Sequence, residues 1–195
     1  MKFTTEIVNA FTTKANGIAR ELRNEILISE IYTPLPGSSE PPRKAYNAIW
    51  DTGATGTVIS RKVAQELNLK ATGRETVQTV GSGDQVNEYE TDTYLINVYL
   101  PNDVAIIAVR ASEGKIAGAD VLLGMDIIAG GDFSVTNSKG QTHWTFRFPS
   151  IESIDFVEEI EEFKRKYRRR IPLSPDEARK QRNKEKSERR EKRRK

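Results

Sequence analysis

The chain has 195 residues, which suits one compact domain with an appendage and is too short for a two-lobed enzyme of roughly 300 residues. It contains no cysteine and a single histidine, His143, so disulfides, thiolate metal sites and a cysteine nucleophile are excluded. The net charge of +3 combines two opposite parts, because residues 164–195 carry a net +12 and the rest carries −9. The acidic body is therefore not expected to hold nucleic acid on its own surface.

Taken in chain order, residues 3–148 have the pattern of an all-β domain. Short runs rich in Ile, Val, Thr, Tyr and Phe alternate with Gly, Asn, Asp and Pro turn signals. The clearest predicted strands are 26–32, 45–50, 76–80, 94–100, 104–109 and 143–148. Residues 33–44 contain four of the eight prolines and predict a surface loop.

Two segments within this domain predict short helices. Ser60 precedes residues 61–67, where apolar side chains at 63, 64 and 67 share a helical face. Residues 125–129, between glycines, predict a second helical stretch.

Beyond the β domain, which we place at residues 1–150, the composition changes twice. Residues 151–163 are acidic with apolar positions three apart, which favours an amphipathic helix or linker. Residues 164–195 form a basic tail, and Ser174 and Glu177 have the spacing of a capping box. The tail is expected to be helical or disordered. It is either a solvated segment that aids solubility or a weak docking site for RNA or another polyanion.

The N-terminal sequence lacks the apolar core of a signal peptide, and no run approaches the roughly 18 apolar residues of a membrane span. We therefore expect a soluble cytoplasmic protein without membrane contact. We also expect no cofactor. No metal is expected either, because Asp120, Asp126 and Asp132 fit turns and helix ends, where aspartate is common.

The segment that carries chemistry is residues 48–60, where an apolar strand ends in Asp51, Thr52, Gly53, Ala54 and Thr55. Gly53 allows a tight turn that presents the carboxylate. Peptide hydrolysis without metal, cysteine or histidine needs paired carboxylates, one acting as general base on water and its protonated partner as general acid. Two such charges about 3 Å apart repel by roughly 5 kcal/mol at an effective dielectric near 20, so the pair shares one proton.

This segment resembles the active-site signature of the retropepsin-like aspartic proteases. Residues 121–128 resemble the family's second hallmark, in which an apolar strand with Leu122 and Leu123 leads through Gly124 into a short helix. The resemblance covers roughly residues 18–148 and implies a closed β-barrel with one or two short helices. It also implies that Asp51 is catalytic, that Thr52 locks two active-site turns together, and that the residues before Gly124 pack beneath the Asp51 loop.

The same resemblance places the mobile flap at Gly81, Ser82 and Gly83, where hairpin-tip glycines would supply the mobility. Because the chain has one Asp-Thr-Gly, the second carboxylate must come from another copy, which predicts a homodimer acting on a peptide or protein substrate.

Three other interpretations remain open. A catalytically inactive barrel would bind a partner instead of cleaving it. Asp51, Gly53 and Thr55 also fit a phosphate-binding turn of actin-like kinases, although that fold needs a much longer chain. Residues 81–86 could suggest a dinucleotide-binding loop, although they lack the third glycine of that fingerprint.

Overall fold

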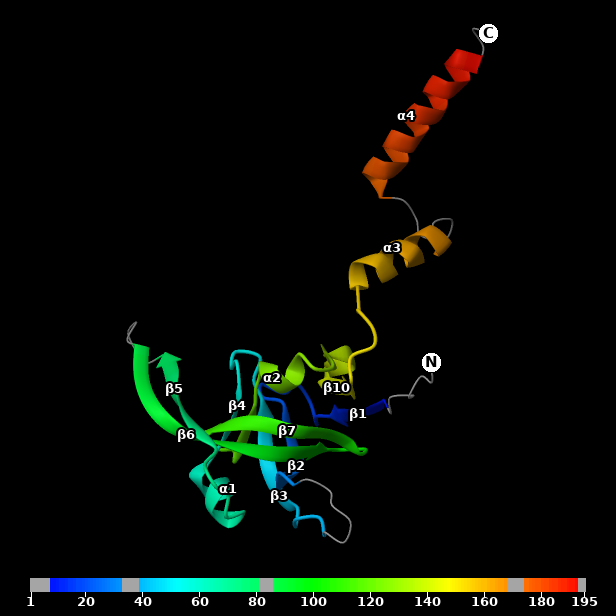
Figure 1. Cartoon of the computed structure of the whole chain (residues 1–195). Coiled ribbons are helices and arrows are strands. Elements are labelled where there is room, and N and C mark those ends of the chain that lie inside the picture. The colour runs from blue at the N-terminus through cyan, green and yellow to red at the C-terminus, as the bar shows by residue number, and fades with distance from the viewer. Residues whose placement is uncertain (1–7, 33–38, 81–85, 168–173, 193–195) are drawn as a thin grey trace, which may run out of the picture. The chain divides into compact units, whose positions relative to one another are not determined.

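In this computed structural model, residues 8–32, 39–80, 86–167 and 174–192 are described (Figure 1). The chain divides into two units, Met1–Glu152 and Ser153–Lys195. The first unit contains all of the described strands, and the second contains two helices.

Six strands of the first unit form a closed barrel. Each strand is hydrogen-bonded to the next, and pairing between the last and the first closes the ring. Two of the neighbouring pairs, β3 with β8 and β4 with β7, run parallel. The predicted all-β closed barrel is thereby confirmed. In barrel order the strands are β2 (Arg23–Glu30), β3 (Lys44–Trp50), β8 (Val121–Leu123), β4 (Thr57–Ile59), β7 (Val104–Glu113) and β6 (Val86–Leu100).

Alternation of side chains along the strands fills the barrel. In β2, Asn24, Ile26 and Ile28 are buried, whereas Glu25 and Leu27 are exposed. This period of two places every second side chain on the inner face of a strand. Ile26 and Ile28 belong to one continuous apolar core that also includes residues of β3, β4, β6, β7 and β8.

The strand β5 (Gly73–Val80) lies outside the closed ring and pairs only with β6 among the described residues. The two strands form a long antiparallel hairpin that extends away from the barrel in Figure 1. Its register runs from Gly73 opposite Thr93 to Val80 opposite Val86. The predicted strand at 76–80 is confirmed, and it belongs to a longer element.

A second, three-stranded sheet in the same unit joins distant parts of the chain. It has the order β1 (Asn9–Lys14), β10 (His143–Phe148) and β9 (Asp132–Thr136), and both pairings are antiparallel. β10 was predicted, whereas the strands on either side of it were not. Their apolar residues are too few for a strong alternating pattern, and pairing with β10 stabilises them.

Both predicted short helices are present, as α1 (Arg61–Glu66) and α2 (Met125–Ile128). Each buries one small apolar face, with Val63 and Ala64 in α1 and Ile127 and Ile128 in α2. Ser60 is at the N-cap of α1, but its hydroxyl makes no capping hydrogen bond. A single 3₁₀ turn, η1 (Ser138–Gly140), lies between β9 and β10.

The second unit consists of α3 (Phe156–Tyr167) and α4 (Pro175–Lys192). The predicted capping box at the start of α4 is confirmed, because Ser174 Oγ and Glu177 Oε2 lie 2.8 Å apart and the Glu177 amide donates to Ser174 Oγ at 3.3 Å. None of the described helices combines the length and apolar character required to cross a membrane. The domain boundaries at residues 150 and 163 stay predictions, and the second falls inside α3.

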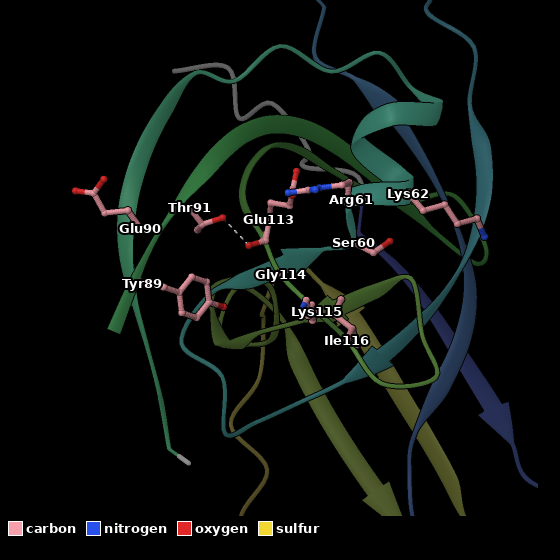
Figure 2. A pocket seen from close by; sticks show the side chains of 10 residues that line it. All are labelled: Ser60, Arg61, Lys62, Tyr89, Glu90, Thr91, Glu113, Gly114, Lys115 and Ile116. Atoms are coloured by element: carbon pink, nitrogen blue, oxygen red, sulfur yellow. Dashed lines mark hydrogen bonds and ion pairs between the residues drawn. The ribbon is translucent and has the colours of Figure 1, made fainter. Parts of the chain in front are cut away.

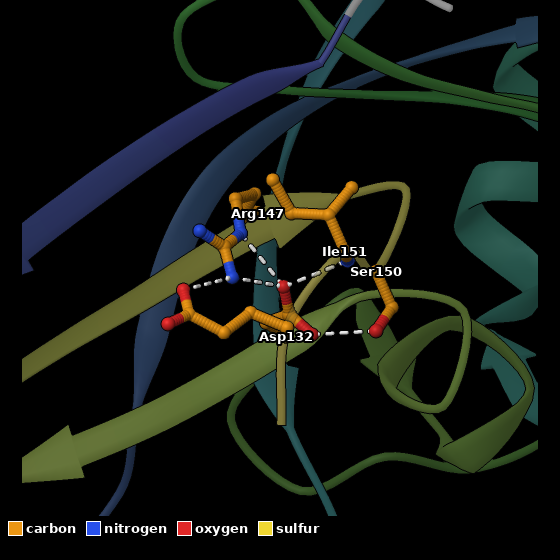
Figure 3. A network of polar contacts seen from close by, with 5 residues as sticks. Asp132, Arg147, Ser150 and Ile151 are labelled. Atoms are coloured by element: carbon orange, nitrogen blue, oxygen red, sulfur yellow. Dashed lines mark hydrogen bonds and ion pairs between the residues drawn. The ribbon is translucent and has the colours of Figure 1, made fainter. Parts of the chain in front are cut away.

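A polar cluster fixes the end of the first unit (Figure 3). Asp132 Oδ1 accepts a hydrogen bond from Ser150 Oγ at 2.5 Å, and Oδ2 accepts from the Ile151 amide at 3.1 Å and from Arg147 Nε at 2.7 Å. Arg147 also contacts Glu152 at 3.2 Å. The hydrogen bonds from Ser150, Ile151 and Arg147 lower the pKa of Asp132 to about 2.

This pKa predicts a pH window for the contribution of Asp132 to stability. Its carboxylate has a lower pKa when folded than the usual 3.8, so the stabilisation is present above about pH 4 and is lost as the pH falls toward 2. Asp132→Asn should lower Tm at pH 7, with an effect that shrinks through this window in thermal unfolding followed by circular dichroism. Asp103→Asn is the control, because Asp103 is exposed and takes part in no ion pair within the described chain. An identical pH dependence of the two variants would contradict the assignment.

Candidate active site

Asp51 lies directly after β3, at the point where this strand leaves its parallel partner β8. Trp50 is opposite Leu123 in the register, and the Asp51 amide continues the ladder by donating to the Leu123 carbonyl at 3.0 Å. The backbone of Asp51 is therefore held by the fully buried end of β8.

A tight turn closes on the carboxylate. The Gly53 amide donates to Asp51 Oδ1 at 2.8 Å, and the Ala54 amide donates to the Asp51 carbonyl at 3.3 Å. A Cβ atom at Gly53 would lie 3.1 Å from Asp51 Oδ1, so a side chain would crowd the oxygen that the turn binds. Glycine at this position thus lets a backbone donor orient the carboxylate.

The two predicted motifs meet through their backbones. The Ala54 carbonyl accepts from the Met125 amide at 2.8 Å, and the Thr55 carbonyl accepts from the Asp126 amide at 3.2 Å. These donors belong to the first turn of α2 and would otherwise lack partners within that helix. Gly124 lies so close to Gly56 that an added Cβ would be 2.5 Å from the Gly56 carbonyl carbon. The loop after β3 and the start of α2 are consequently one interlocked structure.

Asp126 adds side-chain bonds to this junction, which the sequence analysis did not foresee. Its carboxylate accepts from the Thr57 amide at 3.0 Å and from the Thr57 hydroxyl at 2.9 Å, and also from the Ile127 amide at 3.0 Å. The only signal was an acidic residue in the first turn of a helix, a common preference. Nothing in that preference indicated a partner 69 positions away.

On the other side of the Asp51 loop, Trp50 packs into an aromatic cluster. Its ring stacks on that of Phe133, with ring centroids 5.0 Å apart, and its centroid lies 5.1 Å from that of the Phe146 ring. Burial of such rings is a major source of stability. This cluster attaches β3 to the three-stranded sheet, immediately before Asp51 in the chain.

Buried Asn24 lies at the centre of this attachment. Its Oδ1 accepts hydrogen bonds from the indole Nε1 atoms of both Trp50 and Trp144, each at 2.9 Å. Its Nδ2 donates to Thr13 Oγ1 at 2.7 Å. One amide therefore connects β2, β3, β10 and β1.

A pocket of about 980 Å³ lies between the start of α1, β6 and the end of β7 (Figure 2). Glu113 organises one wall, because it pairs with Arg61 at 2.8 Å and its backbone carbonyl accepts from the Thr91 hydroxyl at 2.7 Å. The pocket contains none of the residues of the Asp51 loop. Its lining residues are Ser60, Arg61, Lys62, Tyr89, Glu90, Thr91, Glu113, Gly114, Lys115 and Ile116.

The Asp51 carboxylate is half-buried, and Thr52 and Gly53 are exposed in the single chain. Within the described residues, no group of three or more histidine or acidic side chains could hold a metal ion. The Asp51 carboxylate is thus oriented by one backbone donor, the Gly53 amide, at the surface of the chain.

The candidate site lies in the part of the chain that matches a known protein family. A family model described as gag-polyprotein putative aspartyl protease matches residues 43–129. The predicted resemblance to the retropepsin-like aspartic proteases is confirmed. The match begins just before β3 and ends just after α2, so the matched segment includes both interlocked motifs. It covers less than half of the chain, and the three-stranded sheet lies outside it.

Two solved structures are similar to larger parts of the chain. A retropepsin-like aspartic protease from Rickettsia conorii is 12% identical, with a TM-score of 0.46 over 73% of this chain and 96% of its own. EIAV protease, in a complex with the inhibitor HBY-793, is 19% identical, with a TM-score of 0.37 over 59% of this chain and 91% of its own. No curated protein matches the chain.

The structure brings most of the predicted site residues together. Residues 51–55 form one turn. The Leu123 carbonyl accepts a hydrogen bond from the Asp51 amide, and Gly124 approaches Gly56, just beyond this turn. Leu122 pairs with Ile49 and Val58 in the barrel wall. The predicted flap residues Gly81, Ser82 and Gly83 lie outside the described residues, so the flap stays a prediction.

Removal of the Asn24 amide should destabilise the attachment beneath the Asp51 loop. Asn24→Leu leaves two buried indole donors without an acceptor, and each unsatisfied donor costs about 1–3 kcal/mol. We expect urea unfolding to show a loss of at least about 2 kcal/mol in the free energy of unfolding. Asn47→Leu is the matched control, because Asn47 is exposed on β3 and should change stability little. Equal stability of the two variants would contradict this role of Asn24.

Proposed function

We propose that this protein is an aspartic endopeptidase whose active site is formed by two copies of the chain, each supplying Asp51. The observation that carries the proposal is the orientation of the half-buried Asp51 carboxylate by the Gly53 amide, at the surface of an aspartyl protease segment. Activity, substrate class and assembly are proposals that this geometry supports.

The chemistry follows from bringing two such carboxylates together. At about 3 Å they repel too strongly to ionise together, so the pair holds one proton over an acidic to near-neutral range. The ionised member takes a proton from water, which attacks the peptide carbonyl, while the protonated member donates to the carbonyl oxygen. No metal or cofactor takes part in this scheme.

The need for two copies follows from the count of motifs. The sequence contains one Asp-Thr-Gly, and a twofold axis beside Asp51 would supply the second one. Thr52 is exposed, and its hydroxyl has no hydrogen-bond partner within the described chain. This supports a role for Thr52 in bonding to the same loop of the second copy.

The sharpest test mixes active and inactive chains. Asp51→Asn should abolish cleavage of a peptide library and keep the circular dichroism spectrum of the parent. When equal amounts of parent and Asp51→Asn chains exchange subunits, only parent homodimers have both carboxylates. Activity should then fall to roughly one quarter of that of the same total concentration of parent dimer.

The outcomes of this mixture separate the competing interpretations. A fall to one half would mean that each chain acts alone. Retention of activity by Asp51→Asn would remove Asp51 from the chemistry. If the parent forms a verified dimer and cleaves no peptide between acidic and neutral pH, the alternative of an inactive binding module would replace the enzyme.

We also propose that the basic tail binds polyanions weakly. The tail has 17 basic and 5 acidic residues, and the described side chains of α4 lie almost entirely in solvent. Each phosphate contact releases counterions, so binding should weaken steeply with salt. The tail has no aromatic residue after Tyr167, which leaves no platform for base stacking.

Deletion of the residues after Arg170 should therefore separate two properties. Cleavage of a short uncharged peptide should change less than about twofold, because the removed residues are outside the protease segment. Binding of single-stranded RNA, measured by fluorescence anisotropy at low and moderate salt, should be lost. A collapse of cleavage would show that the tail is a structural part of the enzyme.

A further inference from the structure

Helix α3, in the second unit, carries a stripe of large, exposed apolar side chains. Phe156, Ile160 and Phe163 are separated by four and three residues and are 61%, 50% and 51% exposed. This spacing places them on one face of a helix, in the pattern of a coiled-coil seam. Tyr167 extends the stripe by another four positions, and its ring lies 4.5 Å from that of Phe163.

The charges of α3 are separated along its length. Its first seven residues contain four glutamates, and its last turn contains Lys164, Arg165 and Lys166. Two ion pairs lie within the helix, Lys164 with Glu161 at 2.8 Å and Arg165 with Glu162 at 3.8 Å. The helix therefore has an acidic end and a basic end.

Two charged residues beside the apolar stripe are not part of these ion pairs. Glu159 precedes Ile160, and Lys166 precedes Tyr167. In the heptad that the stripe defines, these residues occupy the same flanking position one repeat apart. Neither takes part in an ion pair within the described residues, although Lys166 Nζ lies 5.7 Å from the Tyr167 ring centroid.

An N-cap defines the start of α3 and therefore fixes which side chains share its apolar face. Asp155 Oδ1 accepts from the Val157 amide at 2.8 Å and from the Glu158 amide at 3.2 Å, as an N-cap does. A 12-residue helix is nevertheless marginal on its own in water and gains most of its stability from packing. Burial of the stripe against a partner would supply that packing.

We propose that α3 pairs with α3 of a second copy of this chain in antiparallel orientation. In this arrangement Ile160 packs against Phe163 of the partner subunit, and Phe156 packs against Tyr167 of the partner subunit. Glu159 then lies beside Lys166 of the partner subunit, and the twofold axis repeats every contact.

Charge complementarity selects both the partner and the direction. Antiparallel pairing places the acidic half of one helix beside the basic half of the other. Parallel pairing places four glutamates beside four glutamates, and like charges at this separation oppose association. The helix thus carries its own complement, which favours a second copy over an unrelated protein.

This pairing adds a second contact to the proposed dimer. Its consequence for activity rests on the proposed two-chain active site. Two short helices bury too little surface for a stable interface alone. Linked to the protease bodies, they raise the effective concentration of each body near the other. Association through α3 would therefore extend activity to lower protein concentrations.

The first experiment measures self-association of the full chain by sedimentation equilibrium. It uses the Asp51→Asn background, so that proteolysis cannot alter the sample. Ile160→Asp should raise the dimer dissociation constant about tenfold or more, because it places a charge in the seam. Ile154→Asp is the matched control, because Ile154 is equally exposed at 50% and precedes α3. The control should leave the constant within about twofold.

The second experiment tests the direction with charge reversals, which keep the apolar stripe and need no loss of helix. Glu159→Lys and Lys166→Glu should each weaken the dimer several-fold at low salt. The double variant should restore the original constant to within about twofold, because the pair is re-formed with its charges exchanged. In a parallel pair Glu159 would face Lys164 of the partner subunit, and the double variant would not be rescued.

Several results would overturn the inference. An unchanged dissociation constant for Ile160→Asp would do so. If this variant also lowered Tm, the result would mean that α3 packs on its own protease body. Failure of the double variant to restore dimerisation would exclude antiparallel pairing. Because these measurements use an inactive background, absence of peptidase activity would overturn the proposed function and leave the α3 result intact.

Discussion

The backbones of Gly56 and Gly124 touch where the loop after β3 meets the start of α2. A Cβ atom on Gly124 would lie 2.5 Å from both the carbonyl carbon and the oxygen of Gly56. This close approach lets the carbonyls of residues 54 and 55 reach the first amides of α2. Since the same turn presents Asp51, the absence of a side chain at one position controls the geometry of the whole site.

Polar anchors lie on both sides of the Asp51 turn. Asp126 holds Thr57 on the side toward α2, whereas Asn24 holds the indole of Trp50 on the side toward the three-stranded sheet. Asn24 and Thr57 are buried, and buried polar groups with hydrogen-bond partners favour one arrangement over its alternatives.

Sequence patterns predicted most of the barrel and the composition of the site, because alternation and glycine spacing are local properties. Ser174 and Glu177 formed their capping box as expected, since its partners are three residues apart. The bonds of Asp126 to Thr57 and of Asn24 to Trp144 span 69 and 120 positions, and only the folded topology brings them together. Asn24 could have been suspected, because it lies in phase with Ile26 and Ile28 on the inner face of β2.

The shared acceptor of the two indoles has a spectroscopic consequence. Trp50 and Trp144 are the only tryptophans in the chain, both are buried, and both donate to the same oxygen. Their fluorescence therefore reports on one small region, the junction of barrel and three-stranded sheet directly behind Asp51. Neither α3 nor α4 contains an indole, so neither helix contributes tryptophan emission. A shift in emission therefore reports a change around these two indoles in the first unit.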